Sequence, residues 1–452
     1  MFSKSSSFGR LVMVLAIIAV FAFWSRNVMR STLELPDQQR WAVSDPDSLY
    51  HLRRIQLWMD GGSIGEGIDP WLNHPHGARV PWPPYYTVAA RIMMGPGAPD
   101  DAWERTHWIE RRAAHLPIFF GVLTSLLAAI GAWIILRPTS SPKNSDDVDL
   151  RTPGAMAAGL LHAFCNASIY YSSIGNADHH AFVSCLNGAM MVSLVWVMKS
   201  GVLRRSEKRW GFTSSTRWGA LIGMFAGILL GAWVGSLMYV ITFQLALAAL
   251  LFFHARKPMT GLPAFGLSFH LAAMLILLPA VICSPWLEEN PWMVVNLSWF
   301  HPLFLLCGAG VFVPLLSLSK DPSKSVFRRY PWIVGSVLAG LALILSVVPN
   351  PIEDGVREGY SWLSTTEEFM TNVAESRPLI GDGAESGVLT QYLGYGIFLL
   401  PIAWLLVALS MLRQRKMLAA SPSLSAIAPL PLIIAIPFLA LPALSQRRFG
   451  DA

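Results

Sequence analysis

Charged side chains are scarce in this sequence: they make up 14% of the 452 residues, whereas 53% are hydrophobic. Soluble domains carry about 25% charged residues, so this composition excludes an ordinary soluble protein. Cysteine is scarce too, and no two of the four cysteines are spaced as CxxC, which favours buried packing residues over disulfides or a cysteine-ligated metal. There are no internal repeats of solenoid length. We therefore expect an all-α polytopic membrane protein.

Long apolar runs supply the spans that this class requires. A helix needs roughly 20 apolar residues to cross a bilayer, and on that criterion the sequence predicts about eleven transmembrane helices. The first run is followed by Arg26 and Arg30 and by no small-residue cleavage site, so we interpret it as a retained anchor. The predicted spans are about 10–24, 115–136, 154–174, 181–199, 217–235, 237–253, 262–283, 297–318, 331–348, 391–411 and 427–445.

Basic residues indicate the orientation of these spans. Lys and Arg gather in short loops such as 254–257 and 413–416, which the positive-inside pattern places in the cytoplasm together with the N-terminus. Two long loops, 25–114 and 349–390, are then external. The net charge of +6 suits anionic headgroups and lipid phosphates and requires no nucleic-acid partner. We expect one transmembrane domain over 1–452, with interfacial helices in the loop 25–114.

The first of three acidic clusters lies in the loop 25–114. Asp45 and Asp47 precede Leu49, Leu52 and Ile55, whose helical spacing predicts a short interfacial helix. Asp45 is suited to cap that helix, and Asp47 to stabilise its first turn, so local pattern alone is compatible with purely structural roles.

The second cluster, Asp178-His179-His180, separates the third and fourth predicted spans. Asp178 could cap the next helix, but capping leaves two imidazoles unexplained, and Asp with His is a common ligand pair for Mn²⁺ and related ions. Because consecutive residues diverge on a helix, we expect one histidine to share a site with Asp178, and we favour His180. His74 and His76 are further candidate ligands, although the prolines around them favour a structural turn.

The third cluster lies in the acidic loop 349–390, where Glu375 follows a short apolar stretch. Composition alone favours a solvated charge for Glu375, because the loop holds several other carboxylates. The span count nevertheless places all three clusters on one membrane face. Carboxylates and imidazoles gathered there predict a metal site that acts on a lipid-borne substrate.

Taken in order, these segments resemble the catalytic subunit of oligosaccharyltransferase, a multispanning GT-C glycosyltransferase. Asp47, followed six residues later by Arg53, resembles the first-loop motif of that family. Asp178-His179-His180 resembles its second acidic motif, written DxD, DxE or DxH, and residues 373–376 around Glu375 resemble the TIXE/SVSE motif. Segments 73–77 and 82–84 resemble the first loop of bacterial and archaeal members, and segment 446–449 resembles the Arg-Phe element.

The resemblance implies a GT-C fold and an inverting, metal-dependent glycosyltransferase. The implied donor is a glycan on a polyprenyl (pyro)phosphate, the implied acceptor is a polypeptide asparagine, and the active site is on the external or periplasmic side of a prokaryotic cell (inner) membrane. The implied site residues are Asp47, Asp178 and His180 on Mn²⁺ or Mg²⁺; Asp47 and Glu375 on the acceptor amide; Arg448 or Arg447 on the donor pyrophosphate; and His179, Arg53, His74 and His76 in support.

Departures from the family keep alternatives open. Members have thirteen spans and a C-terminal domain whose WWDYG motif binds the Ser or Thr of the sequon, and this sequence contains no WWDYG. A separate chain supplies that domain, or the sequence is a fragment, or the acceptor is not a sequon. Alternative functions are a GT-C transferase using a lipid-monophosphate sugar and a hydroxyl acceptor, a partial non-catalytic paralogue, and a lipid-glycan transporter. A transporter is disfavoured because the acids lie at span ends rather than mid-membrane.

Overall fold

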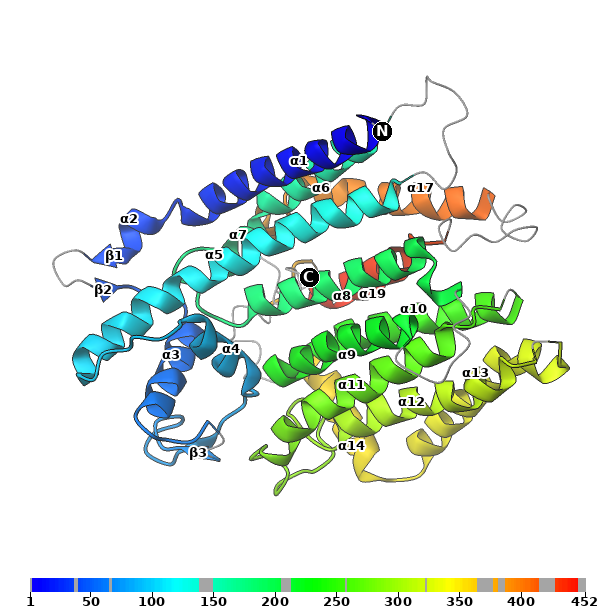
Figure 1. Ribbon diagram of the computed structural model, residues 1–452. Coiled ribbons are helices and arrows are strands. Elements are labelled where there is room, and N and C mark those ends of the chain that lie inside the picture. The colour runs from blue at the N-terminus through cyan, green and yellow to red at the C-terminus, as the bar shows by residue number, and fades with distance from the viewer. Residues whose placement is uncertain are drawn as a thin grey trace.

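The computed structural model is almost entirely helical (Figure 1). Two short antiparallel strand pairs are its sheets in the part of the chain described here. The structure describes residues 2–35, 40–64, 67–137, 149–204, 213–256, 258–321, 323–363, 377–380, 387–413 and 427–445.

Within these residues, eight helices are long and apolar enough to cross a membrane. The predicted class, a polytopic helical membrane protein, is therefore confirmed. These helices are α1 (Phe2–Asn27), α5 (Ala102–Ile135), α8 (His180–Ser200), α9 (Ser214–Ala232), α10 (Leu237–Arg256), α11 (Leu262–Ile282), α12 (Phe300–Leu318) and α13 (Ser325–Val347).

The other three predicted spans correspond to shorter helices, so the count of eleven stays a prediction. The span expected at 391–411 covers α16 (Val388–Leu393), η5 (Tyr395–Leu399) and α17 (Leu400–Arg413), and the one at 427–445 covers α19 (Leu430–Ser445). The expectation of one helix over 154–174 was wrong, because the chain forms α6 (Arg151–Ala163) and α7 (Asn166–Ser172).

Side chains from α1 explain the break between α6 and α7. Ser25 and Arg26, both buried, donate hydrogen bonds to the carbonyl of Ala163 over 2.9 and 3.2 Å. Arg26 also donates to the hydroxyls of Ser168 and Ser172 on α7. The last carbonyls of a helix lack partners within it, and here a partner from α1 satisfies one of them where the chain turns.

The first long loop folds against the end of the helices where α8 begins. The predicted helix is α3 (Pro46–Met59), with Asp45 as its cap: Asp45 Oδ2 accepts a hydrogen bond from the backbone N–H of Ser48 over 3.0 Å. Helix α3 buries His51, Leu52 and Ile55 on one face. The loop also contains α2 (Arg30–Leu33), β1 (Glu34–Leu35) paired with β2 (Arg40–Trp41), β3 (Ile68–Asp69) paired with β4 (Ala78–Arg79), and α4 (Tyr85–Met93).

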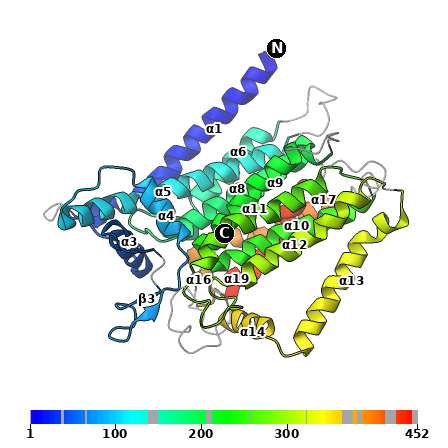
Figure 2. The ribbon, with the colours of Figure 1, turned by 60° about the horizontal axis from the view of Figure 1, so that its bottom comes forward.

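The helices α5, α8, α9 and α11 lie side by side in Figures 1 and 2. Close packing of α9 on α11 depends on Gly219, Gly223 and Gly227, where a Cβ would overlap backbone carbonyls of α11. Such stripes of small residues let membrane helices approach closely. In Figure 2, α3, α4 and α14 (Pro351–Leu363) lie at the same end of this layer. Short helices η2 (Val202–Arg204) and η3 (Val234–Ser236) connect the long ones.

Candidate metal centre

The turn between α7 and α8 brings the second acidic cluster against the start of α3. Gly175 has φ +87°, a conformation that favours glycine, and a Cβ there would meet Leu33. Its N–H donates to the carbonyl of Ala114 over 2.9 Å, and its carbonyl accepts from the N–H of Ser44 over 3.1 Å. The backbone of residue 44 is thereby fixed beside residue 175, so the acidic start of α3 and Asp178 share one region.

Asp178 is buried and surrounded by three buried histidines. Its Oδ1 lies 2.5 Å from His179 Nδ1 and 3.3 Å from His51 Nε2, and it accepts a hydrogen bond from the N–H of His179 over 2.6 Å. Its Oδ2 lies 3.5 Å from His180 Nε2. The rings of His179 and His180 are stacked, and both lie against Trp233. One carboxylate therefore contacts imidazoles from α3 and from the start of α8.

This cluster fits a divalent cation. In the part of the chain that the structure describes, one ligand atom each from His51, Asp178 and His179 lies within 4.8 Å of the other two. One ring nitrogen of each histidine faces Asp178, and the other, Nδ1 of His51 and Nε2 of His179, is buried with no hydrogen-bond partner among the described residues. Two imidazoles and one carboxylate form a common ligand set for zinc and for other first-row transition metals.

The electrostatics of the cluster also suit a cation. Burial opposes ionisation of Asp178, but His179 and His51 outweigh it and hold the pKa of that carboxyl well below its usual range. Burial, together with the charge of Asp178, raises the pKa of Asp45. Burial lowers the pKa of His51 to about 4, so its imidazole is neutral at pH 7, the form that binds metals. A bound cation would relieve the repulsion between the two carboxylates.

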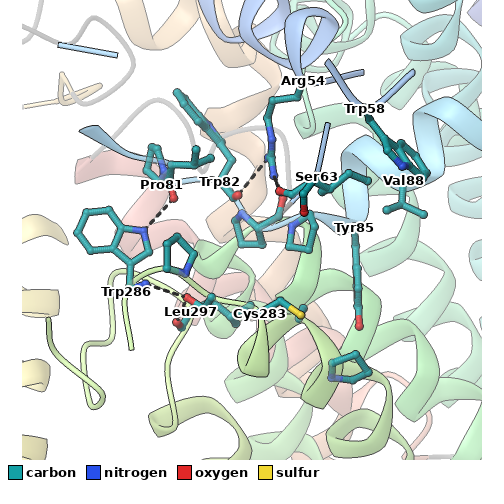
Figure 3. Close-up of a pocket in the computed structure, with 18 residues that line it drawn as sticks. Arg54, Trp58, Ser63, Pro81, Trp82, Tyr85, Val88, Cys283, Trp286 and Leu297 are labelled. Atoms are coloured by element: carbon teal, nitrogen blue, oxygen red, sulfur yellow. Dashed lines mark hydrogen bonds between the residues drawn. The ribbon is translucent and has the colours of Figure 1, made fainter. Parts of the chain in front are cut away.

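Aromatic residues of the first loop enclose the cluster on the side of α3. The ring of His51 lies 4.8 Å from Tyr86 and 5.9 Å from Trp82. The loop that carries Trp82 is held from two sides (Figure 3): Arg54 donates to the carbonyl of Trp82 over 3.1 Å, and Trp286 Nε1 donates to that of Val80 over 2.8 Å.

A mostly apolar cavity of about 350 Å³ adjoins this loop (Figure 3). Its wall includes Arg54, Trp82 and Tyr85 from the first loop, and Cys283 and Trp286 from the segment after α11. Its volume lies in the range of small-molecule pockets. Arg54 is buried and bonded to the carbonyls of Ile64 and Trp82, so its guanidinium maintains the wall.

Comparisons with known proteins agree with this architecture, although no family profile matches the chain. Over 156 residues the chain is 27% identical to dolichyl-phosphooligosaccharide-protein glycotransferase 1 of Archaeoglobus fulgidus, a match that covers 34% of this chain and 22% of the relative. Glycotransferase 2 of the same organism is 25% identical over 158 residues, 35% of this chain and 23% of the relative. The chain is thus related to oligosaccharyltransferase catalytic subunits. The resemblance drawn from its motifs is confirmed.

Solved oligosaccharyltransferase structures share the fold. The A. fulgidus oligosaccharyltransferase AglB, in complex with an inhibitory peptide and a dolichol-phosphate, superposes with a TM-score of 0.74 at 16% identity, over 98% of this chain and 48% of that one. A complex of the A. fulgidus enzyme with Zn and sulfate gives a TM-score of 0.66 at 16% identity, over 97% of this chain and 47% of that one. The predicted GT-C-like fold is confirmed, and the chain spans about half the length of these solved enzymes.

The structure alters the expectation for the second oligosaccharyltransferase motif. We expected only one of the two following histidines, His180, to share a site with Asp178. Both rings contact the carboxylate, and among the described residues the ligand atoms close enough to hold one ion include His179 instead of His180. Which of the two would bind a metal stays a prediction. The divergence of consecutive side chains applies within a helix, whereas Asp178 precedes α8 and His179 is its N-cap. His51 was not predicted as a site residue. Its one available signal was its position four residues after Asp47, on the same face of the expected helix.

The other residues predicted from the first loop lie on α3 and on the 69–76 turn: Asp47, Arg53, His74 and His76. Asp47 lies in the first turn of α3, one turn before His51, and its role as a ligand stays a prediction. Arg53 forms two hydrogen bonds with Asp69, over 2.7 and 2.8 Å, which hold the 69–76 turn to α3. His74 and His76 are exposed on that turn.

Three predicted site residues, Glu375, Arg447 and Arg448, lie outside the described residues.

Proposed function

We propose that this chain transfers a glycan from a polyprenyl-(pyro)phosphate donor to a polypeptide, at an asparagine amide. The buried cluster of Asp178 with three histidines carries the proposal, because it lies at the membrane-domain end where α3 and α8 begin, in a fold shared with AglB. The solved AglB is in complex with an inhibitory peptide and a dolichol-phosphate, which belong to the same two chemical classes as the proposed substrates.

We propose that a divalent ion, Mn²⁺ or Mg²⁺, binds at Asp178, with Asp47 and His180 as the further ligands that the motifs imply. The buried imidazoles that converge on the carboxylate of Asp178 fit such an ion. When bound, the ion would stabilise the negative charge that develops on the leaving pyrophosphate.

The protein side chains would orient the two substrates. An amide nitrogen is a weak nucleophile, so Asp47 and Glu375 would accept hydrogen bonds from the acceptor amide and aim it for in-line attack, which inverts the sugar configuration. Arg448 or Arg447 would pair with a donor phosphate through two parallel hydrogen bonds, a geometry that Lys lacks. His179, Arg53, His74 and His76 would support these groups.

The proposed location is a prokaryotic cell membrane, with Asp178 and the loops 25–114 and 349–390 on the external face. The basic loops at the opposite ends of the spans support this orientation. An ion bound at a span end also avoids the cost of about 2.5–3.5 kcal/mol for a charge at the bilayer centre.

A transfer assay with the purified chain, a lipid-linked glycan and an Asn-containing peptide tests this function, with glycopeptide measured by mass spectrometry. We expect Asp178→Ala, Asp47→Ala and chelation each to reduce transfer by orders of magnitude, and added Mn²⁺ to restore the chelated wild type. Asp321→Asn, a change at an exposed site away from the cluster, is the control. Full transfer by Asp178→Ala after chelation contradicts the metal site. Transfer only from a lipid monophosphate to a hydroxyl favours the alternative GT-C activity.

A further inference from the structure

His51 has no role in the ligand set that the motifs imply, yet it is fully buried in the wall of the candidate metal centre. It lies on α3, whereas Asp178, His179 and His180 come from the chain at the start of α8. Its Nε2 is 3.3 Å from Asp178 Oδ1.

The other ring nitrogen of His51, Nδ1, is buried and has no hydrogen-bond partner among the described residues. A buried polar atom without a partner costs about 1–3 kcal/mol, so such atoms usually have a reason in the fold or in function. His179 has the same arrangement: its Nδ1 lies 2.5 Å from the same carboxylate oxygen, and its Nε2 is buried without a hydrogen-bond partner among the described residues. Two buried imidazoles, each with one nitrogen that lacks a partner, therefore converge on one oxygen of Asp178.

Packing holds the ring of His51 in this direction. Tyr86 meets it nearly edge-on, with the ring centres 4.8 Å apart, and Tyr86 is fixed by a hydrogen bond to the carbonyl of Ala177, the residue before Asp178. Trp82 covers another side, on the loop that Arg54 and Trp286 anchor in Figure 3. The imidazole is thus positioned before any ion binds.

We propose that His51 is a nitrogen ligand of the divalent ion at Asp178, together with His179. This inference rests on the proposed function only in assuming that an ion binds there. A site with two imidazoles and one carboxylate prefers Mn²⁺ or Zn²⁺ to Mg²⁺, which favours oxygen ligands.

Binding of MnCl₂ to the purified full chain tests the ligand role without measuring turnover. We expect pulsed EPR of the wild type to show ¹⁴N couplings from at least two imidazoles. His51→Gln should remove one coupling and weaken Mn²⁺ binding at least about 100-fold, since even groups that only orient a ligand change metal affinity 10–100-fold. His301→Gln, which replaces another fully buried histidine, is the matched control and should bind Mn²⁺ like the wild type.

A competition experiment on the wild type covers the case in which His51→Gln does not fold. We expect Mn²⁺ to bind at least about 100-fold more tightly than Mg²⁺, as a nitrogen-containing site requires. Unchanged affinity and ¹⁴N coupling in His51→Gln overturn the ligand role and leave the proposed function intact. Wild-type Mn²⁺ without ¹⁴N coupling, or with an affinity equal to that of Mg²⁺, also overturns it. A wild type that binds neither ion overturns both the inference and the metal dependence of the proposed function.

Discussion

The ion pair between Arg53 and Asp69 should determine whether the 69–76 turn stays docked on α3. Asp69 is buried, and its carboxylate accepts four hydrogen bonds: two from Arg53 at 2.7 and 2.8 Å, one from the Tyr50 hydroxyl at 3.1 Å and one from the Trp71 N–H at 2.9 Å. Asp69→Asn keeps the shape of the side chain, but it removes the charge and directs an NH₂ group towards other donors.

The expected cost follows from these contacts. Asn retains one acceptor oxygen, so at least one charge-assisted hydrogen bond is lost, and each contributes about 1.5–3 kcal/mol. The Arg53 side chain is 30% exposed, so solvent recovers part of this loss. We therefore expect opening of the turn to become easier by about 2 kcal/mol, a change of roughly 30-fold in the open population.

Hydrogen exchange followed by mass spectrometry measures this change on the intact protein in fixed detergent. Amides of residues 69–80 should exchange roughly 30-fold faster in Asp69→Asn, while α11 and α12 keep their protection. The control is Glu289→Gln, which removes one ion pair, 3.0 Å long, between Glu289 and Arg79. The Glu289 side chain is 56% exposed, so its loss should change the free energy of opening by less than about 1 kcal/mol. Equal effects of the two variants, or faster exchange spread over the whole chain, would refute the reasoning.

Three further predictions concern packing, orientation and the acceptor. Gly121→Ala should lower the free energy of unfolding in detergent by about 1–3 kcal/mol, because the added Cβ would overlap Arg26. Gly188→Ala, where the added Cβ would lie 3.6 Å from its nearest neighbour, should be neutral or stabilising. Equal melting temperatures of the two variants contradict this. Cysteines introduced into loop 349–390 should react with an impermeant reagent added outside cells, and protection there means that the orientation is wrong. Glu375→Gln should reduce acceptor use while leaving donor-lipid binding intact, and an equal effect of Glu368→Gln would indicate bulk charge only.

Much of the architecture could be predicted from the sequence, because each signal was local. Apolar runs marked the spans, since a bilayer requires about 20 apolar residues for each helix. The spacing of Leu52 and Ile55 after Asp45 marked α3 and its cap. The Asp178 motif marked the centre of the candidate site, because helix capping by Asp178 leaves the two following imidazoles unexplained.

Only the tertiary structure revealed where α6 ends and what His51 faces. Ser25 and Arg26 interrupt the expected third span through hydrogen bonds to Ala163, which is 138 and 137 residues away in the chain. Periodicity places His51 on the buried face of α3, but it does not say what covers that face. His51 and Asp178 meet because the Gly175 turn docks on residue 44, and no local pattern encodes such a long-range backbone contact.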